Sequence, residues 1–193
     1  MPQPSPDPEK LRRAHPLAVR LIEALPAGAR VIEIGAGRGR NTEALQAAGM
    51  HVQAIADPDA PHFATQPESF DAALSTHAFL HGTLESAAHM IAAAARALRA
   101  GAPLYCTFAS VSDARFGKGR KLGEATYAPE EGAEAGVAHV YFDRKRLVDL
   151  LEPLFTIDEL TETPADTTVG RWAHADPPAG TVHWFVRACK RAG

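Results

Sequence analysis

Residues 30–41 read Arg30-Val31-Ile32-Glu33-Ile34-Gly35-Ala36-Gly37-Arg38-Gly39-Arg40-Asn41. The first five residues are mostly apolar and β-branched, which predicts a short buried strand that runs directly into the glycines. A strand that ends in a glycine loop and opens a helix forms a binding site for an anion or a nucleotide. Glycines let a ligand approach the backbone, and the helix N-terminus offers unpaired N–H donors. An ordinary tight turn is the alternative, but it gives no reason for three spaced glycines.

On both sides of this loop the sequence alternates strands with helices, which is typical of a doubly wound α/β sheet. Apolar residues at helical spacing predict helices over 10–25, 41–48, 83–99 and 143–151, with Thr83 and Asp143 as N-caps. Short apolar runs predict strands over 30–34, 51–56, 70–75, 103–108, 155–161 and 181–189. The stretch 110–140, rich in glycine and charge, is predicted to be irregular, and loops of this length are usually functional or mobile.

Length and composition fit one domain. A chain of 193 residues that is 46% hydrophobic can bury a substantial core, and we assign 10–193 to a single domain that follows a proline-rich, disordered tail over 1–9. The net charge of -3 provides no basic field, which argues against nucleic acid as the main partner. No apolar run reaches the roughly 18 residues of a membrane span and no apolar signal region is present, so the cytoplasm is the expected location.

Two classes of ligand use a glycine loop of this kind. The dinucleotide fingerprint G-x-G-x-x-G places its third glycine where this chain has Arg40. The glycines are instead spaced Gly35-x-Gly37-x-Gly39, and Glu33 lies two residues before the first of them. Both features resemble the first motif of class I S-adenosylmethionine (SAM) methyltransferases. In that family the acid orients the loop or the amino group of methionine, and the glycines accommodate methionine and ribose.

Further segments extend this resemblance over about residues 11–190. The run 38–42 is similar to the Gly-Arg-Asn run of the tellurite-resistance type of methyltransferase, 69–76 to the fourth-strand motif of the family, and 98–104 to the segment before its fifth strand. Segments 77–83, 116–120 and 182–184 resemble a small bacterial branch of the family. The resemblance implies SAM as cofactor, and the residues that it assigns to SAM are Glu33, Gly35, Ala36, Gly37, Gly39, Asn41, Asp57, Ser75 and Thr76.

The ribose site departs from the family pattern. The family has an acid at the end of its second strand that binds both ribose hydroxyls, and that position falls on Ala56 here, with Asp57 following. A side chain one residue later in a strand points to the opposite face, but Pro58 bends the chain, so Asp57 can still reach the ribose. Alternatively, Asp57 and Asp59 are the turn residues of an Asp-Pro-Asp segment.

The connection after the second strand is too short for the family's usual elements. Only the twelve residues 58–69 separate it from the next predicted strand, whereas a crossover with one helix already needs about 10–12 residues. We therefore predict that strand three is missing and that the sheet has the order 2-1-4-5-7-6 in the family's strand numbering, with 181–189 antiparallel. The strand 51–56 then becomes an edge, covered by 58–69 or by a second copy in a homodimer.

Histidines provide candidate chemistry. His77 and His81 follow the strand 70–75 at the carboxyl end of the sheet, where doubly wound folds bind ligands, and either can act as a general base near pH 7. We single out His77 as the catalytic candidate. Both can equally be pocket-lining or core residues without a chemical role. Their spacing would suit a metal on a helix, but no third ligand lies nearby in the sequence, so no metal is expected.

Later side chains can complete the substrate side. The basic run 115–121 forms either a solvated loop face or a site that attracts an anion, and a further group either closes the substrate side or forms a core cluster: His139, Tyr141, His183 and Trp184. We predict methyl transfer from SAM to a small molecule by a monomer or a homodimer. A non-catalytic protein of the same fold is the first alternative, because of Ala56 and the shortened connection. A nicotinamide-dependent oxidoreductase is the second, disfavoured by Arg40.

Overall fold

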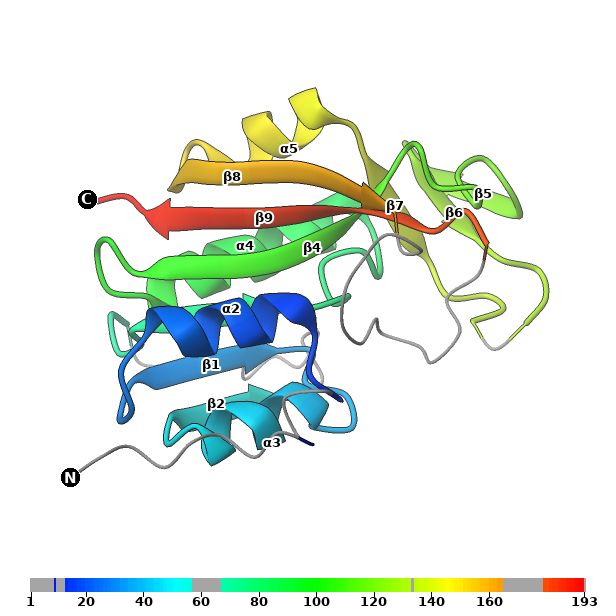
Figure 1. Ribbon diagram of the computed structural model, residues 1–193. Coiled ribbons are helices and arrows are strands. Elements are labelled where there is room, and N and C mark those ends of the chain that lie inside the picture. The colour runs from blue at the N-terminus through cyan, green and yellow to red at the C-terminus, as the bar shows by residue number, and fades with distance from the viewer. Residues whose placement is uncertain (1–8, 10–12, 57–66, 133, 165–178, 193) are drawn as a thin grey trace.

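A computed structural model describes residues 9, 13–56, 67–132, 134–164 and 179–192 of the chain. This part of the chain forms one mixed sheet with helices on both faces (Figure 1). β2, β1, β3 and β4 run parallel, and β9 is antiparallel to both of its neighbours. The main strands, in spatial order, are β2 (His51–Ile55), β1 (Arg30–Ile34), β3 (Ala72–Ser75), β4 (Pro103–Ser110), β9 (Val182–Lys190) and β8 (Phe155–Pro164).

This order confirms the predicted arrangement 2-1-4-5-7-6 for the described strands, because β9 lies antiparallel between β4 and β8. Within the described ranges β2 pairs with β1 alone, and all of its residues are exposed or half-buried, as expected of an edge. Residues 57–66, including Asp57, lie outside the described residues, as do residues 1–8 of the predicted tail. The deletion of strand three and the cover of the edge therefore stay predictions.

Two helical layers cover the sheet. α2 (Pro16–Ala24) and α3 (Arg40–Ala47) share an apolar cluster with one face, and α4 (Leu84–Ala97) and α5 (Arg144–Leu151) share a larger cluster with the other (Figure 1). Successive strand residues point to opposite faces, so Val31 joins the first cluster and its neighbour Ile32 the second, both fully buried. No helix in the described ranges is long and apolar enough to cross a membrane.

The predicted caps are confirmed at two helices. Thr83 and Ser86 form a reciprocal capping box at the start of α4, and the carboxylate of Asp143 accepts from the Arg146 amide at the start of α5. The predicted continuous helix over 10–25 is wrong in its extent, because the backbone of His15 is extended and α2 begins at Pro16. A residue before proline is biased away from helical backbone angles, so the helix begins at the proline and not before it.

The stretch 110–140 is more ordered than the sequence predicts. It contains β5 (Arg120–Gly123) and β6 (Thr126–Ala128), which pair with each other, and β6 pairs with β7 (His139–Phe142). Ala109 and Ser110 at the end of β4 pair in parallel with β7, and the other edge of β4 pairs with β9 from Pro103 to Ala109. The sheet therefore forks at the carboxyl end of β4, and β7, β6 and β5 form one branch of the fork (Figure 1).

Candidate functional site

A cavity of about 600 Å³ lies at the carboxyl ends of β1, β3 and β4, where open α/β sheets bind ligands. Its volume falls within the range of small-molecule sites, about 300–1,000 Å³. The glycine loop forms one wall, the turn after β3 forms the floor, and residues from the fork and from β9 form the far wall. The described residues that line it are Arg13, Gly35, Ala36, Gly37, Arg38, Arg40, Asn41, Thr76, His77, Leu80, His81, Arg115, Glu134, His139, Thr181 and His183.

Asn41 joins three segments around the glycine loop. Its amide nitrogen donates to Glu33 Oε1 at 3.2 Å and to Thr76 Oγ1 at 3.1 Å, and its oxygen accepts from the His15 amide at 2.8 Å. Glu33 also accepts from the Thr42 hydroxyl, and burial raises the pKa of the Glu33 carboxyl while these hydrogen bonds oppose that shift. Glu33 lies outside the cavity lining, so its contacts in the described chain hold the loop.

The first two glycines of the motif occupy different surroundings. Gly35 has φ +75°, and a Cβ there would lie 2.4 Å from the Cβ of Ala78, so the close approach of the two loops requires glycine. Gly37 has φ +53°, and a Cβ there would meet nothing within 4 Å. The space beside Gly37 is therefore open, whereas the space beside Gly35 is filled by the protein.

The predicted cofactor residues separate into three groups. Gly35, Ala36, Gly37, Asn41 and Thr76 line the cavity, as does the catalytic candidate His77. Glu33, Gly39 and Ser75 do not line it. Glu33 and Ser75 are buried, within two residues of the lining residues Gly35 and Thr76. Asp57 lies outside the described residues.

His77 belongs to a row of three histidines. Its amide donates to Thr107 Oγ1 at 3.0 Å, its φ is +72°, and its ring lies 5.5 Å from the ring of His15 and 5.1 Å from that of His183. Burial lowers the pKa of His183 to about 3, and burial together with His77 and Arg40 lowers the pKa of His15. Both neighbours are therefore neutral near pH 7. His15 was not predicted to be a site residue, because in the sequence it lies within an apolar helical stripe.

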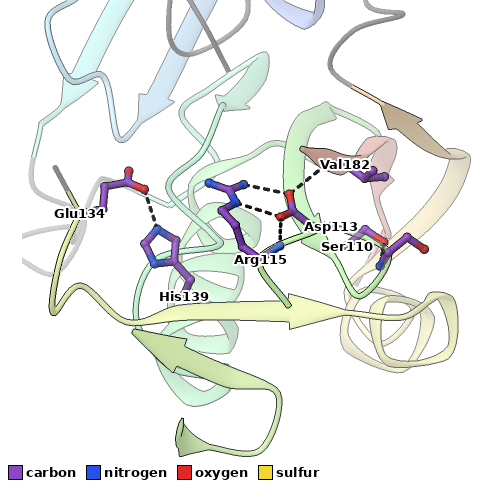
Figure 2. Close-up of polar contacts among 7 residues, drawn as sticks. Ser110, Asp113, Arg115, Glu134, His139 and Val182 are labelled. Carbon is purple, nitrogen blue, oxygen red and sulfur yellow. Dashed lines mark hydrogen bonds and ion pairs between the residues drawn. The ribbon is translucent and has the colours of Figure 1, made fainter. Parts of the chain in front are cut away.

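Arg115 is held on the far wall by a buried carboxylate. Its Nε and Nη2 donate to the two oxygens of Asp113 at 2.9 Å each, and this pairing is the main reason why the pKa of Arg115 is raised (Figure 2). Asp113 has no exposed side-chain surface and also accepts from the amides of Arg115 and Val182 at 2.9 Å. Arg115 is the one residue of the basic run 115–121 that lines the cavity within the described chain.

Three groups meet where β7 passes the turn after β3. His81, Glu134 and His139 each offer a ligand atom, and these atoms lie within 4.8 Å of one another. Residues 77–80 form bends and a turn and His81 forms an isolated bridge, so the helix that would have placed His77 and His81 on one face is absent there. Of the four late residues, His139 and His183 line the cavity, whereas Tyr141 and Trp184 are buried core residues.

No family model matches the chain, and no curated protein is significantly similar to it in sequence. Solved structures do match. A SAM-dependent methyltransferase from Methanosarcina mazei aligns with a TM-score of 0.63 at 17% identity, over 94% of this chain and 100% of that chain. The 1,6-didemethyltoxoflavin N1-methyltransferase of Burkholderia thailandensis, solved with 1,6-didemethyltoxoflavin and S-adenosylhomocysteine bound, aligns with a TM-score of 0.63 at 22% identity, over 92% and 78%. The [4+2]-cyclase SpnF aligns with a TM-score of 0.56 at 14% identity, over 92% and 81%.

The chain therefore has the fold of the class I SAM-dependent methyltransferases. Its resemblance to the tellurite-resistance type stays a prediction. A cyclase aligns on the same fold, so the fold alone does not identify the reaction, which depends on the residues that line the cavity.

Proposed function

We propose that this chain transfers a methyl group from SAM to a small acceptor that carries an anionic group. The observation that supports this best is one cavity of about 600 Å³ with the glycine loop on one side and Arg115, His77 and His183 on the other. Cofactor and acceptor can meet in such a cavity, and methyl transfer needs little more than their alignment.

The cofactor side fits an extended polar ligand. The open space beside Gly37 allows a ligand to approach the backbone closely. Asn41 fixes the loop through its three hydrogen bonds, so the loop is already arranged before a ligand binds. A site organised in advance loses less free energy on ordering when the ligand arrives.

The acceptor side favours a negative charge. Of the four arginines that line the cavity, Arg38 and Arg40 belong to the glycine loop and Arg115 to the far wall. Glu134 is the single acidic residue among the described lining residues. Arg115 is the best positioned of them, because Asp113 fixes its guanidinium plane from behind. A guanidinium fixed in this way suits a carboxylate or phosphate on the acceptor, since its planar donors match two oxygens at once.

His77 is our candidate for the general base. When bound, SAM would supply an electrophilic methyl group whose bond to sulfur breaks to leave S-adenosylhomocysteine. The acceptor heteroatom would lose its proton as its lone pair forms the new bond to that carbon. His77 lines the cavity and can accept that proton. His15 and His183 are neutral, so they place no positive charge against the imidazolium that would form.

The first test compares binding of S-adenosylhomocysteine with binding of NAD by calorimetric titration. We expect S-adenosylhomocysteine to bind and the Gly37→Val variant to bind it about tenfold more weakly or worse, because the new side chain fills the open space. Gly101→Val is the matched control. Gly101 also has a positive φ, +76°, with nothing within 4 Å of its Cβ position, and it does not line the cavity.

Each outcome of this titration separates the candidates. Equal losses in the Gly37 and Gly101 variants would assign the effect to backbone strain and contradict the proposed site. Binding of NAD in place of S-adenosylhomocysteine would favour an oxidoreductase. Binding of neither would favour a non-catalytic protein of this fold.

A further inference from the structure

Two imidazoles and a carboxylate converge on one point at the edge of the cavity. Glu134 Oε1 lies 3.8 Å from His81 Nε2, and Glu134 Oε2 lies 3.3 Å from His139 Nε2. Ligand atoms that share a metal ion with bonds of about 2.1 Å lie about 3.0–3.4 Å apart. The observed separations are close to that spacing, so small side-chain movements would complete a coordination sphere.

The hydrogen bonding of His139 favours a metal at this point. Its Nδ1 lies 2.9 Å from the carbonyl oxygen of Val137, which can only accept, so Nδ1 is the donor and Nε2 presents a lone pair. His139 is 3% exposed, and its buried Nε2 lies against the Glu134 carboxylate at 3.3 Å (Figure 2), without the geometry of a hydrogen bond to any described residue. A histidine whose other ring nitrogen donates to a backbone carbonyl is the usual arrangement of a metal ligand.

The backbone holds both histidines in place. His81 and His139 form an antiparallel bridge, and the hydrogen bonds on either side of it join Gly82 to Ala138 and Val140 to Leu80, each at 2.8 Å. The two rings lie 4.9 Å apart at 87°. Ligands that belong to paired backbone segments keep their geometry better than ligands on separate loops.

We propose that His81, Glu134 and His139 bind a divalent transition-metal ion, for which Zn²⁺ has the best match. Two imidazole nitrogens and one carboxylate oxygen are the ligand set of catalytic zinc sites, which keep a further position open. All three residues line the cavity beside Arg115, so that position faces the acceptor side. An acceptor oxygen, nitrogen or sulfur can bind there. This last role depends on the proposed methyl transfer, whereas the binding of the metal does not.

The test uses tag-free protein treated with a chelator and titrated with Co²⁺, followed by its visible absorption, and then with Zn²⁺ by calorimetry. We expect one equivalent of each metal to bind and Zn²⁺ to displace Co²⁺. Glu134→Gln and His139→Ala should each weaken binding about tenfold or more, since each removes a ligand. Glu134 is partly exposed, so its variant is expected to fold even where the variant of buried His139 does not.

His89→Ala serves as the control, because His89 is an exposed histidine on α4 that does not line the cavity. Absence of stoichiometric binding would overturn the proposal, as would equal affinities in the Glu134 and His89 variants. Titration of the same metal-free sample with S-adenosylhomocysteine tests the methyltransferase proposal separately. A protein that binds S-adenosylhomocysteine but no metal would leave the methyltransferase proposal intact and overturn this one, and a protein that binds the metal but no S-adenosylhomocysteine would do the reverse.

Discussion

The Gly35→Ala variant is expected to lose about 4 kcal/mol in the free energy of unfolding, although alanine adds only one carbon. That carbon would lie 2.4 Å from Ala78 Cβ and 3.4 Å from Ala78 Cα, both at a buried position that cannot move aside. Overpacking costs about 1–3 kcal/mol. The positive φ of +75° adds about 1–2 kcal/mol for any residue with a Cβ. Urea denaturation of the purified variant measures the loss.

Two further variants separate the causes. Combining Gly35→Ala with Ala78→Gly removes the contact but keeps the strained φ, so we expect about 2 kcal/mol to return. Gly37→Ala meets nothing within 4 Å and should lose only the conformational cost, about 1 kcal/mol. If Gly35→Ala loses no more than Gly37→Ala, the contact between the glycine loop and the turn after β3 is not as tight as described.

This difference between two glycines of one motif marks a limit of sequence reasoning. The spacing of Gly35, Gly37 and Gly39 was enough to predict a strand, a loop and a helix, because each depends on neighbouring residues. The pattern could not show that the Cβ position of Gly35 faces Ala78, since that contact joins the loops that follow two neighbouring strands, β1 and β3. All three glycines were therefore assigned to the ligand alike.

Local signals succeeded elsewhere for the same reason. Thr83 and Asp143 cap their own helices, as predicted from the residues beside them. The failures are at β5 and β7. All residues of β5 are exposed, so it has no apolar alternation to read, and β7 is held by pairing with the end of β4, far away in the sequence.

In the candidate site as well, features set by neighbouring residues were predicted and contacts between distant segments were missed. Predictions near the glycine loop rested on adjacent residues, and five of the nine cofactor candidates line the cavity. The metal ligands could not be predicted, because Glu134 and His139 lie more than 50 residues beyond His81 and meet it only through the bridge between two segments. Asp113 was missed as well, although an acid two residues before Arg115 is a signal that the sequence does contain.

The Asp113→Ala variant is expected to lose about 4 kcal/mol in the free energy of unfolding. It removes the partner of the Arg115 guanidinium and leaves the amides of Arg115 and Val182 without their acceptor. Removing one member of a buried ion pair costs about 3–5 kcal/mol, and each orphaned amide adds to the loss. Arg115 is 30% exposed and recovers some hydration, which keeps the expected loss within that range. Urea denaturation measures it.

A double-mutant cycle with Arg115→Ala tests whether the loss comes from the pair. If Asp113 acts by holding Arg115, the double variant should be about 1–2 kcal/mol more stable than the sum of the two single losses predicts, because the guanidinium is no longer left unpaired. Strictly additive losses would contradict this and would assign the role of Asp113 to the Val182 amide at the start of β9. The coupling would show that the buried acid fixes the arginine proposed to meet the acceptor, so a residue outside the cavity lining would determine how its far wall is arranged.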